Sequence, residues 1–174
     1  MSSLEEMGAW RSLSSEATFH LGEALGQRLA PSMGLGLAGE LGAGKTVFVQ
    51  GLAAGMKIDA PLEVRSPTWM LMVEHPGPLP LMHMDAYFAG RGEDFLADGG
   101  QAYLQEGGVL AVEWADRLGL GLPEDFLAIE IEHESPERRR IRMRGQPEIW
   151  RDRLEGLAQG IEDLEEIAFF RQNG

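Results

Sequence analysis

The stretch GELGAGKT, residues 39–46, constrains the fold of this chain more than any other feature. It fits the pattern G-x-x-x-x-G-K-[ST], in which the backbone amides of a glycine-rich loop surround a chain of phosphates. The segment before it, MGLGLAG, is typical of a short buried strand, and the segment after it, KTVFVQGLAAGM, indicates a helix that ends at Gly55. Strand, loop and helix in this order predict a nucleotide triphosphate site, with Lys45 on the β and γ phosphates and Thr46 on Mg²⁺.

Composition narrows the class of protein. The chain has 174 residues and a formal charge of −13, so we expect one domain with a sizeable core and no broad binding of nucleic acid by this chain alone. It has no cysteine, which excludes disulfides and thiolate metal sites. No apolar run is long enough to span a membrane, and the first residues, MSSLEEMGAW, lack the apolar core of a signal peptide. We therefore expect a cytoplasmic protein.

Hydrophobic periodicity predicts an α/β fold. Residues 14–29 carry one apolar helical face, capped by Ser14 or Ser15. Residues 69–74 and 79–85 flank a PGP turn and predict a hairpin, and residues 125–145 predict a second hairpin whose Glu and Arg faces lie side by side on the solvent side. Between the hairpins, residues 92–108 predict helical pieces broken by glycines, and VLAVE, residues 109–113, predicts a buried strand. This order favours a P-loop NTPase-like three-layer sandwich with a mixed central sheet that includes β-hairpins.

The same reading divides the chain into a P-loop ATPase domain, residues 1–145, and a C-terminal helical extension, residues 146–174. Apolar residues recur in the extension at three- and four-residue spacing, and the chain stops at AFFRQNG. An apolar helix must cover something, so we expect it to pack on the sheet of its own domain. A contact with a partner is the second alternative.

Three further patterns can complete a nucleotide site. SPT, residues 66–68, places two hydroxyls before a strand, although a bare tripeptide is more typical of a plain loop. HMDAY, residues 83–87, places Asp85 where an acid suits Mg²⁺ or its water, with a capped turn as an equal alternative. A lone histidine such as His83 more often has a structural role. VEW ends the most apolar strand with Glu113, whose carboxylate is predicted to face the same crevice as Thr46, while Trp114 stacks on a planar group or closes the core.

Together, GELGAGKT, SPT, HMDAY and VEW, in this order and at these intervals, resemble the TsaE family, also called YjeE. That family comprises small bacterial ATPases required for threonylcarbamoyladenosine formation on tRNA, and the resemblance runs from about Ser14 to Arg144. It implies an ATP-binding, weakly ATP-hydrolysing accessory protein that is required for the modification of tRNA beside the anticodon. The implied protein partners are the TsaB–TsaD complex, in which TsaD carries out the transfer, and tRNA is an indirect partner.

The resemblance also implies roles for single residues. The implied nucleotide contacts are Ser15, Gly39, Leu41, Gly42, Ala43, Gly44, Lys45, Thr46, Arg117 and Arg138. The implied catalytic residues are Lys45, Asp85, Glu113 and Trp114, and the implied magnesium ligands are Thr46 and Glu113. The sequence departs from the family at Glu40, Val47 and Phe88, where an aspartate, a second threonine and an arginine are usual. Arg91 is a candidate replacement for that arginine.

Two other functions remain open from the residues themselves. A small P-loop kinase of a metabolite would need an acceptor pocket and usually an arginine-rich lid, and the one arginine cluster, RRRIRMR, alternates like a strand. A nucleotide sensor without catalysis is the other alternative. A GTPase is disfavoured, because an N-K-x-D motif needs an asparagine and the sequence has only Asn173. No arginine stands in a clear position to act as a finger, so we expect hydrolysis by the chain alone to be slow.

Overall fold

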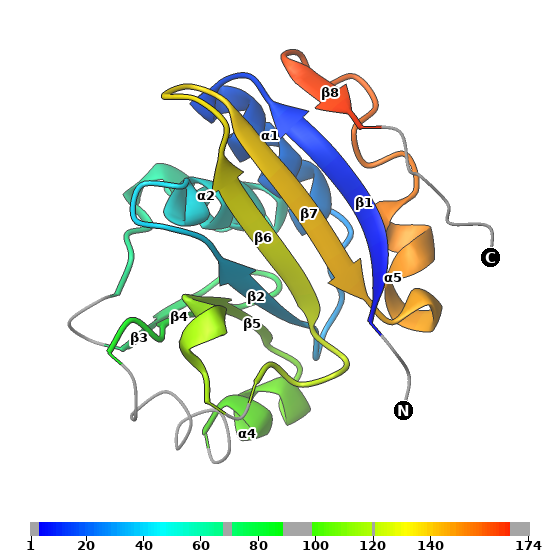
Figure 1. Ribbon diagram of the computed structural model, residues 1–174. Coiled ribbons are helices and arrows are strands. Elements are labelled where there is room, and N and C mark those ends of the chain that lie inside the picture. The colour runs from blue at the N-terminus through cyan, green and yellow to red at the C-terminus, as the bar shows by residue number, and fades with distance from the viewer. Residues whose placement is uncertain (1–3, 68–70, 89–98, 120, 168–174) are drawn as a thin grey trace.

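The computed structural model describes residues 4–67, 71–88, 99–119 and 121–167. Within them, eight strands form one sheet in the order β3-β4-β5-β2-β6-β7-β1-β8 (Figure 1). The strands are β1 Glu5–Ser12, β2 Gly34–Ala38, β3 Met72–His75, β4 Leu81–Asp85, β5 Val109–Glu113, β6 Leu127–His133, β7 Arg139–Gly145 and β8 Leu164–Glu166. The central strands β4, β5, β2 and β6 are parallel, whereas β3 at one edge and β7, β1 and β8 at the other pair antiparallel. The predicted mixed α/β sheet is therefore confirmed.

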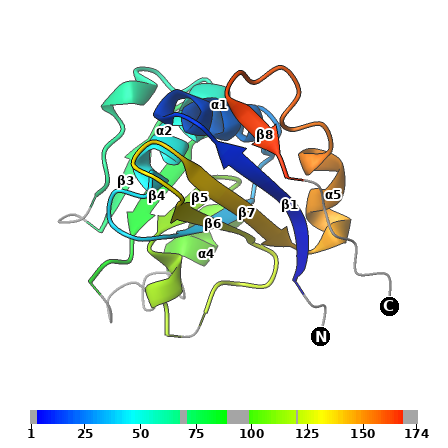
Figure 2. The same cartoon turned by 45° about the horizontal axis from the view of Figure 1, so that its top comes forward.

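Helices lie on both faces of this sheet. The α-helices are α1 Ser15–Gly26, α2 Lys45–Gly55, α4 Gln101–Gln105 and α5 Pro147–Leu154, and two 3₁₀ turns are η1 Pro61–Glu63 and η3 Ala115–Arg117. Figure 2 shows α1 and α2 on one side of the sheet and α4 on the other. The larger core cluster joins α1, α2 and α5 to the sheet, and a smaller cluster joins β4 and β5 to the segment around η3 and Phe126. This gives the three expected layers.

Helices α1 and α2 approach each other closely, and α2 begins directly after the glycine-rich loop. A methyl group on Gly22 would collide with the carbonyl oxygen of Phe48, and one on Gly51 would collide with that of Phe19. Only glycine allows the two backbones to come so near. The predicted N-cap is also confirmed, since Ser14 Oγ accepts a hydrogen bond of 3.0 Å from the amide of Ala17.

The two predicted hairpins are present. In the first, β3 begins at Met72, later than predicted, while residues 69 and 70 lie outside the described residues. In the second, the Glu and Arg faces lie side by side as expected, because Arg142 Nη2 pairs with Glu130 at 3.1 Å and with Glu132 at 2.8 Å. Strand β1 was not predicted, since its run of glycine, alanine and acidic residues has no clear period.

The chain after residue 146 is only partly helical. Helix α5 ends at Leu154, and the next residues are turns in which Gly156, Gly160 and Asp163 have positive φ. Leu164–Glu166 then form β8 beside β1, so the prediction of a helix over this stretch was wrong. Left-handed backbone at three positions interrupts helical hydrogen bonding, and the open edge of β1 offers a strand partner instead.

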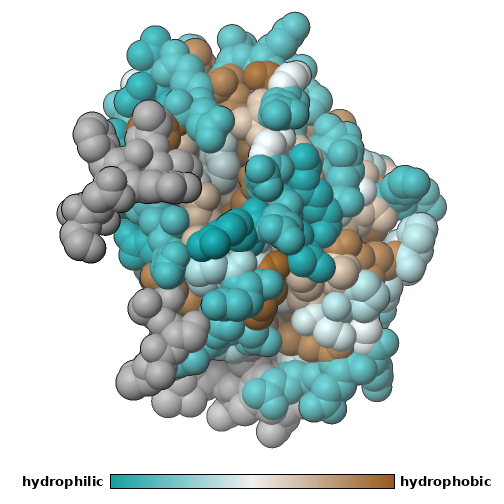
Figure 3. All heavy atoms as spheres, turned by 90° about the vertical axis from the view of Figure 1, so that its right-hand side faces the viewer, coloured by the Kyte–Doolittle hydropathy of each residue, from teal (hydrophilic) through white to brown (hydrophobic). Residues whose placement is uncertain are grey.

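The C-terminal segment packs on its own domain, as expected. Trp150 is fully buried and Leu154 and Leu157 are nearly so, and all three belong to the main core cluster. Figure 3 looks onto the side that carries α5 and β8, where hydrophobic patches lie between hydrophilic side chains. Phe169 and Phe170 lie outside the described residues, and the division into two domains at residue 145 stays a prediction.

No helix in the described ranges has the length and apolar character that crossing a bilayer requires.

Candidate functional site

The glycine-rich loop connects the buried strand β2 to helix α2. Gly39, Gly42 and Gly44 have φ of 149°, 75° and 107°, which side chains rarely tolerate, so the glycines of the motif are needed for the path of the backbone. The loop borders a pocket of about 520 Å³. Its lining residues are Leu41, Gly42, Gly44, Lys45, Thr46, Val47, Ser66, Tyr87, Phe88, Glu113 and Trp114.

The Lys45 side chain folds back over this loop. Its Nζ donates to the carbonyl oxygens of Gly39 at 2.6 Å and Glu40 at 2.9 Å, and it lies 3.6 Å from the centroid of the Trp114 ring. Burial lowers the pKa of the Lys45 ammonium, while the carboxylates of Glu113, Asp116 and Asp85 act in the opposite direction. The positive charge is thus held at the centre of the loop by carbonyl oxygens and an aromatic face.

The Glu113 carboxylate meets the first turn of α2. It ends β5, is 2 % exposed, and accepts hydrogen bonds from Thr46 Oγ1 at 2.9 Å to Oε1 and 3.1 Å to Oε2. Glu113 pairs in register with Leu37 of β2 and with Asp85 of β4, so the parallel strands bring both acids to one edge of the sheet. The predicted meeting of Glu113 and Thr46 in one crevice is therefore observed.

Asp85 is held by two donors from separate segments. Its Oδ1 accepts the backbone amide of Tyr87 at 2.8 Å, and its Oδ2 accepts a hydrogen bond from Ser66 Oγ. Of the SPT motif, Ser66 therefore reaches the site, while Thr68 lies outside the described residues. The capped turn is therefore confirmed, and the bond to Ser66 connects Asp85 to a residue that lines the pocket, while a role of Asp85 toward Mg²⁺ or its water stays a prediction.

An aromatic cluster closes one side of the pocket. Trp114 and Tyr87 meet edge to face with ring centroids 5.0 Å apart, and the Arg117 guanidinium lies 4.3 Å from the Tyr87 ring and 4.8 Å from the Trp114 ring. Arg117 Nη1 also donates to the carbonyl of Tyr87 at 3.0 Å. Trp114 has a φ of 59°, a left-handed conformation that costs energy for a residue other than glycine.

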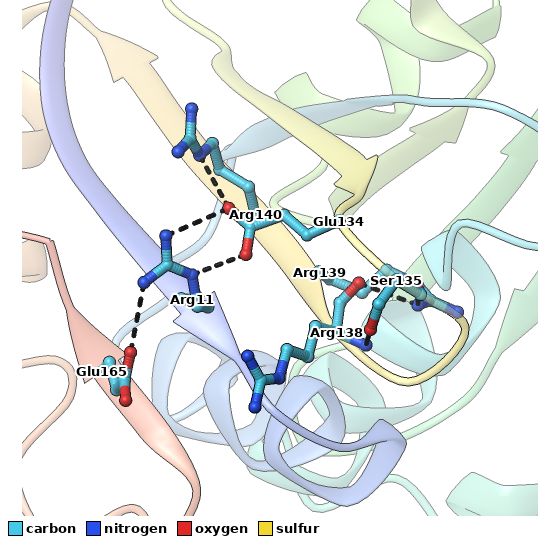
Figure 4. A network of polar contacts seen from close by, with 7 residues as sticks. All are labelled: Arg11, Glu134, Ser135, Arg138, Arg139, Arg140 and Glu165. Carbon is cyan, nitrogen blue, oxygen red and sulfur yellow. Dashed lines mark hydrogen bonds and ion pairs between the residues drawn. The ribbon is translucent and has the colours of Figure 1, made fainter.

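On the other side of the loop, the structure distinguishes two adjacent arginines. Arg139 donates from Nε to the carbonyl of Ala43 at 2.9 Å and from Nη2 to that of Gly42 at 3.4 Å. Arg138 donates its backbone amide to Ser135 Oγ, and its side chain extends away from that of Arg139 (Figure 4). Arg139 also lines a second hollow of about 490 Å³ with Ser15 and the loop residues.

The structure thus brings Lys45, Thr46, Asp85, Glu113 and Trp114 to one place, with Arg117 beside them. Ser15 lies across the loop, and Arg91 lies outside the described residues. Two residues at the site had no predicted role there. The sequence did not single out Arg139, because Arg139 follows Arg138 in a run of arginines. It gave His83 no role at the site, because a single histidine carries little signal. The alternation of His83 and Asp85 along one strand face was the available clue.

Comparison with known proteins decides the family. Residues 12–141 match the family model of TsaE, the threonylcarbamoyl adenosine biosynthesis protein. The chain belongs to the TsaE family. Members of this family take part in threonylcarbamoyladenosine biosynthesis on tRNA, and this chain is one of them.

Individual relatives agree with this membership. The tRNA threonylcarbamoyladenosine biosynthesis protein TsaE of Treponema pallidum is 38% identical over 120 residues, which are 69% of this chain and 87% of the relative. The TsaE protein of Bacillus subtilis is 38% identical over 134 residues, or 76% of this chain and 82% of the relative. The crystal structure of Bacillus subtilis YdiB superimposes with a TM-score of 0.74 at 29% identity, covering 91% of this chain and 97% of that one.

Proposed function

We propose that this chain binds ATP with Mg²⁺ at the glycine-rich loop, hydrolyses it slowly by itself, and serves as an accessory protein of threonylcarbamoyladenosine formation. The observation that carries the proposal is the contact between Thr46 Oγ1 and the Glu113 carboxylate at 2.9 Å. It joins the first turn of α2 to the end of β5, directly beside the buried Lys45 ammonium. A lysine, a hydroxyl and a carboxylate around a glycine loop suit a phosphate chain and its metal ion.

In this proposal, Lys45 and the loop amides bind the phosphates. The amides at the start of α2 and the positive end of the helix dipole attract an anion. The Lys45 ammonium exchanges the carbonyls of Gly39 and Glu40 for β and γ phosphate oxygens, which are stronger, charged acceptors. Trp114 keeps the ammonium near the loop during this exchange, because its ring face attracts the cation.

The donor set at Thr46 and Glu113 fits Mg²⁺. This ion prefers oxygen ligands and usually takes one or two carboxylates together with substrate phosphates and water. The described part of the chain has no group of three or more histidine or acidic side chains arranged to hold a metal by themselves. Thr46 and Glu113 would therefore share the ion with the nucleotide, where it would neutralise charge on the phosphates.

Asp85 and Arg117 complete the proposed mechanism. The amide of Tyr87 and the hydroxyl of Ser66 fix the Asp85 carboxylate, which allows it to orient water near the phosphates. Arg117 places its guanidinium over the rings of Tyr87 and Trp114. In that position it does not serve as an arginine finger, so hydrolysis is slow until a partner changes the site.

The proposed partners are the TsaB–TsaD complex, with tRNA contacted indirectly, in the cytoplasm. A formal charge of −13 opposes tight binding of tRNA by this chain alone. The arginines of β7 do not offset this, because Arg142 and Arg144 already pair with glutamates of β6. Protein contacts are thus the better route to the modification complex.

Titration calorimetry of ATP against the full chain tests the proposal. Wild type should bind ATP, and Lys45→Ala should weaken binding on the order of 100-fold, because a charged hydrogen bond contributes about 1.5–3 kcal/mol and each 1.4 kcal/mol is about tenfold. Lys57→Ala, the other lysine of the chain, is the matched control and should bind normally. Equal affinity of Lys45→Ala and wild type would refute the loop assignment.

The rate of ADP release tests the accessory role. It should be slow for the chain alone and should rise when TsaB, TsaD and tRNA are added together. A rate of ADP release that responds to none of these partners would contradict the accessory role. A rate that rises with a small metabolite as phosphate acceptor would favour a kinase and would also contradict the proposal.

A further inference from the structure

A buried histidine stands directly behind the Glu113 carboxylate. His83 is fully buried on β4, and its Nε2 lies 2.9 Å from Glu113 Oε1. Thr46 Oγ1 approaches the same carboxylate from the pocket side. Three residues from β4, β5 and the start of α2 therefore form one continuous chain of hydrogen bonds.

The hydrogen-bond pattern indicates which ring nitrogen carries the proton. His83 Nδ1 is buried and has no hydrogen-bond partner within the described part of the chain, whereas Nε2 faces a carboxylate. An unpaired N–H in the interior is costly, and a carboxylate needs a donor. We assign the proton to Nε2, from which His83 donates to Glu113.

The register of the sheet provides room for this contact. His83 pairs with Ala111, and Asp85 pairs with Glu113, on adjacent parallel strands. Alternate residues of a strand share a face, so His83, Ala111 and Glu113 lie on the same face of the sheet, and the imidazole reaches Glu113 across that face.

We propose that His83 is a positioning residue that fixes the Glu113 carboxylate for binding Mg²⁺ beside the nucleotide phosphates. This inference rests on the proposed function, because it assumes the metal site at Thr46 and Glu113. A metal-binding carboxylate is itself usually hydrogen-bonded, and loss of such a partner typically weakens metal affinity by about 10–100-fold. His83 is the donor to Glu113 from the interior, and Thr46 is the donor from the pocket.

Two substitutions separate this role from simple packing. In His83→Gln the amide nitrogen lies about as far from the backbone as Nε2 and can still donate to Glu113, whereas in His83→Asn it lies near the place of Nδ1 and cannot. His75→Asn is the matched control, since His75 is a neighbouring histidine whose ring centroid lies 6.1 Å from that of His83. Each variant is titrated with ATP in excess Mg²⁺ and in EDTA, and its melting temperature is measured.

We expect His83→Asn to weaken ATP binding in Mg²⁺ by about 10–100-fold and to leave binding in EDTA within about twofold of wild type. His83→Gln and His75→Asn should keep the effect of Mg²⁺. Equal losses in Mg²⁺ and EDTA, or equal losses for Asn and Gln, would overturn the proposal and leave a packing role. If His83→Asn does not fold, His83→Gln alone decides, because loss of its Mg²⁺ effect would contradict the proposal.

The control on wild type keeps the two proposals apart. Wild type that binds ATP in EDTA but gains nothing from Mg²⁺ would overturn the role of His83 while nucleotide binding stands. Wild type that binds ATP in neither condition would refute the proposed function itself.

Discussion

The parallel and antiparallel halves of the sheet use charged residues in opposite ways. At the ends of parallel strands β4 and β5, Asp85 and Glu113 are almost completely buried. On β6 and β7, the antiparallel pair where the second half begins, Glu130, Glu132 and Arg142 are exposed to 41 %, 44 % and 28 %. Both halves of the sheet carry acidic residues, but among the described residues only the parallel half buries them.

The exposed charges of the antiparallel half pair with one another. Arg11 of β1 contacts Glu134 at 2.5 Å and Glu165 at 3.3 Å, and Arg140 contacts Glu134 at 3.2 Å (Figure 4). The hydrogen bond from Arg11 is the main cause that lowers the pKa of the Glu134 carboxyl. Such pairs in water contribute little to stability.

The buried acids have no comparable explanation in stability. Taking a carboxylate out of water costs several kcal/mol unless its partners compensate, and the partners of Glu113 are a hydroxyl and a histidine. The buried position of Glu113 therefore supports the proposed role in binding Mg²⁺ rather than a role in stability. The comparison teaches that the parallel half holds the site and the antiparallel half mainly holds the fold.

The largest effect on the fold is expected from Trp150→Ala. Trp150 is fully buried, and its Nε1 donates to the carbonyl of Asp125 at 3.0 Å. Its loss should lower the free energy of unfolding by about 3–5 kcal/mol, measured by urea denaturation. ATP affinity of the folded fraction should not change. Trp150→Phe is the control and should retain most of the stability. If Trp150→Ala binds ATP more weakly under conditions in which it is fully folded, the division between the two halves of the sheet is wrong.

An intermediate effect is expected from Arg139→Gln, which sharpens the comparison because Arg139 belongs to β7 yet holds the glycine-rich loop. Loss of its charged hydrogen bonds to Ala43 and Gly42 should lower the free energy of unfolding by about 1.5–3 kcal/mol, measured by urea denaturation. It should also weaken ATP binding, measured by titration calorimetry. Arg139→Lys keeps the charge but loses the planar fork, so it should behave like Gln. Full rescue by Lys would indicate that the positive charge at position 139 is sufficient, and unchanged properties of Arg139→Gln would show that the loop needs no support from β7.

The smallest effect is expected from Arg142→Ala. Its two ion pairs are exposed, so the free energy of unfolding should fall by less than about 1 kcal/mol, and the difference should shrink in high salt. Chemical denaturation at low and high salt measures this, with ATP affinity unchanged. A large loss that persists in high salt would show that the antiparallel half depends on its charge pairs.

Much of the local structure was determined by the sequence by itself. The Ser14 cap, the end of α2 at Gly55 and the path of the glycine-rich loop depend on neighbours a few residues apart, and the structure has all three. Lys45 and Thr46 belong to the same short motif, so their proximity also followed from sequence. Contacts within one or two turns of the chain need no knowledge of the fold.

Only the tertiary structure decided which distant segments meet. Residues 164–166 carry a helical pattern but form a strand, because the edge of β1 supplies their backbone hydrogen bonds. Arg139 reaches the loop across 96 positions of sequence, and His83 reaches Glu113 across 30. Strand pairing and register set such contacts, and these depend on the whole sheet rather than on any local pattern.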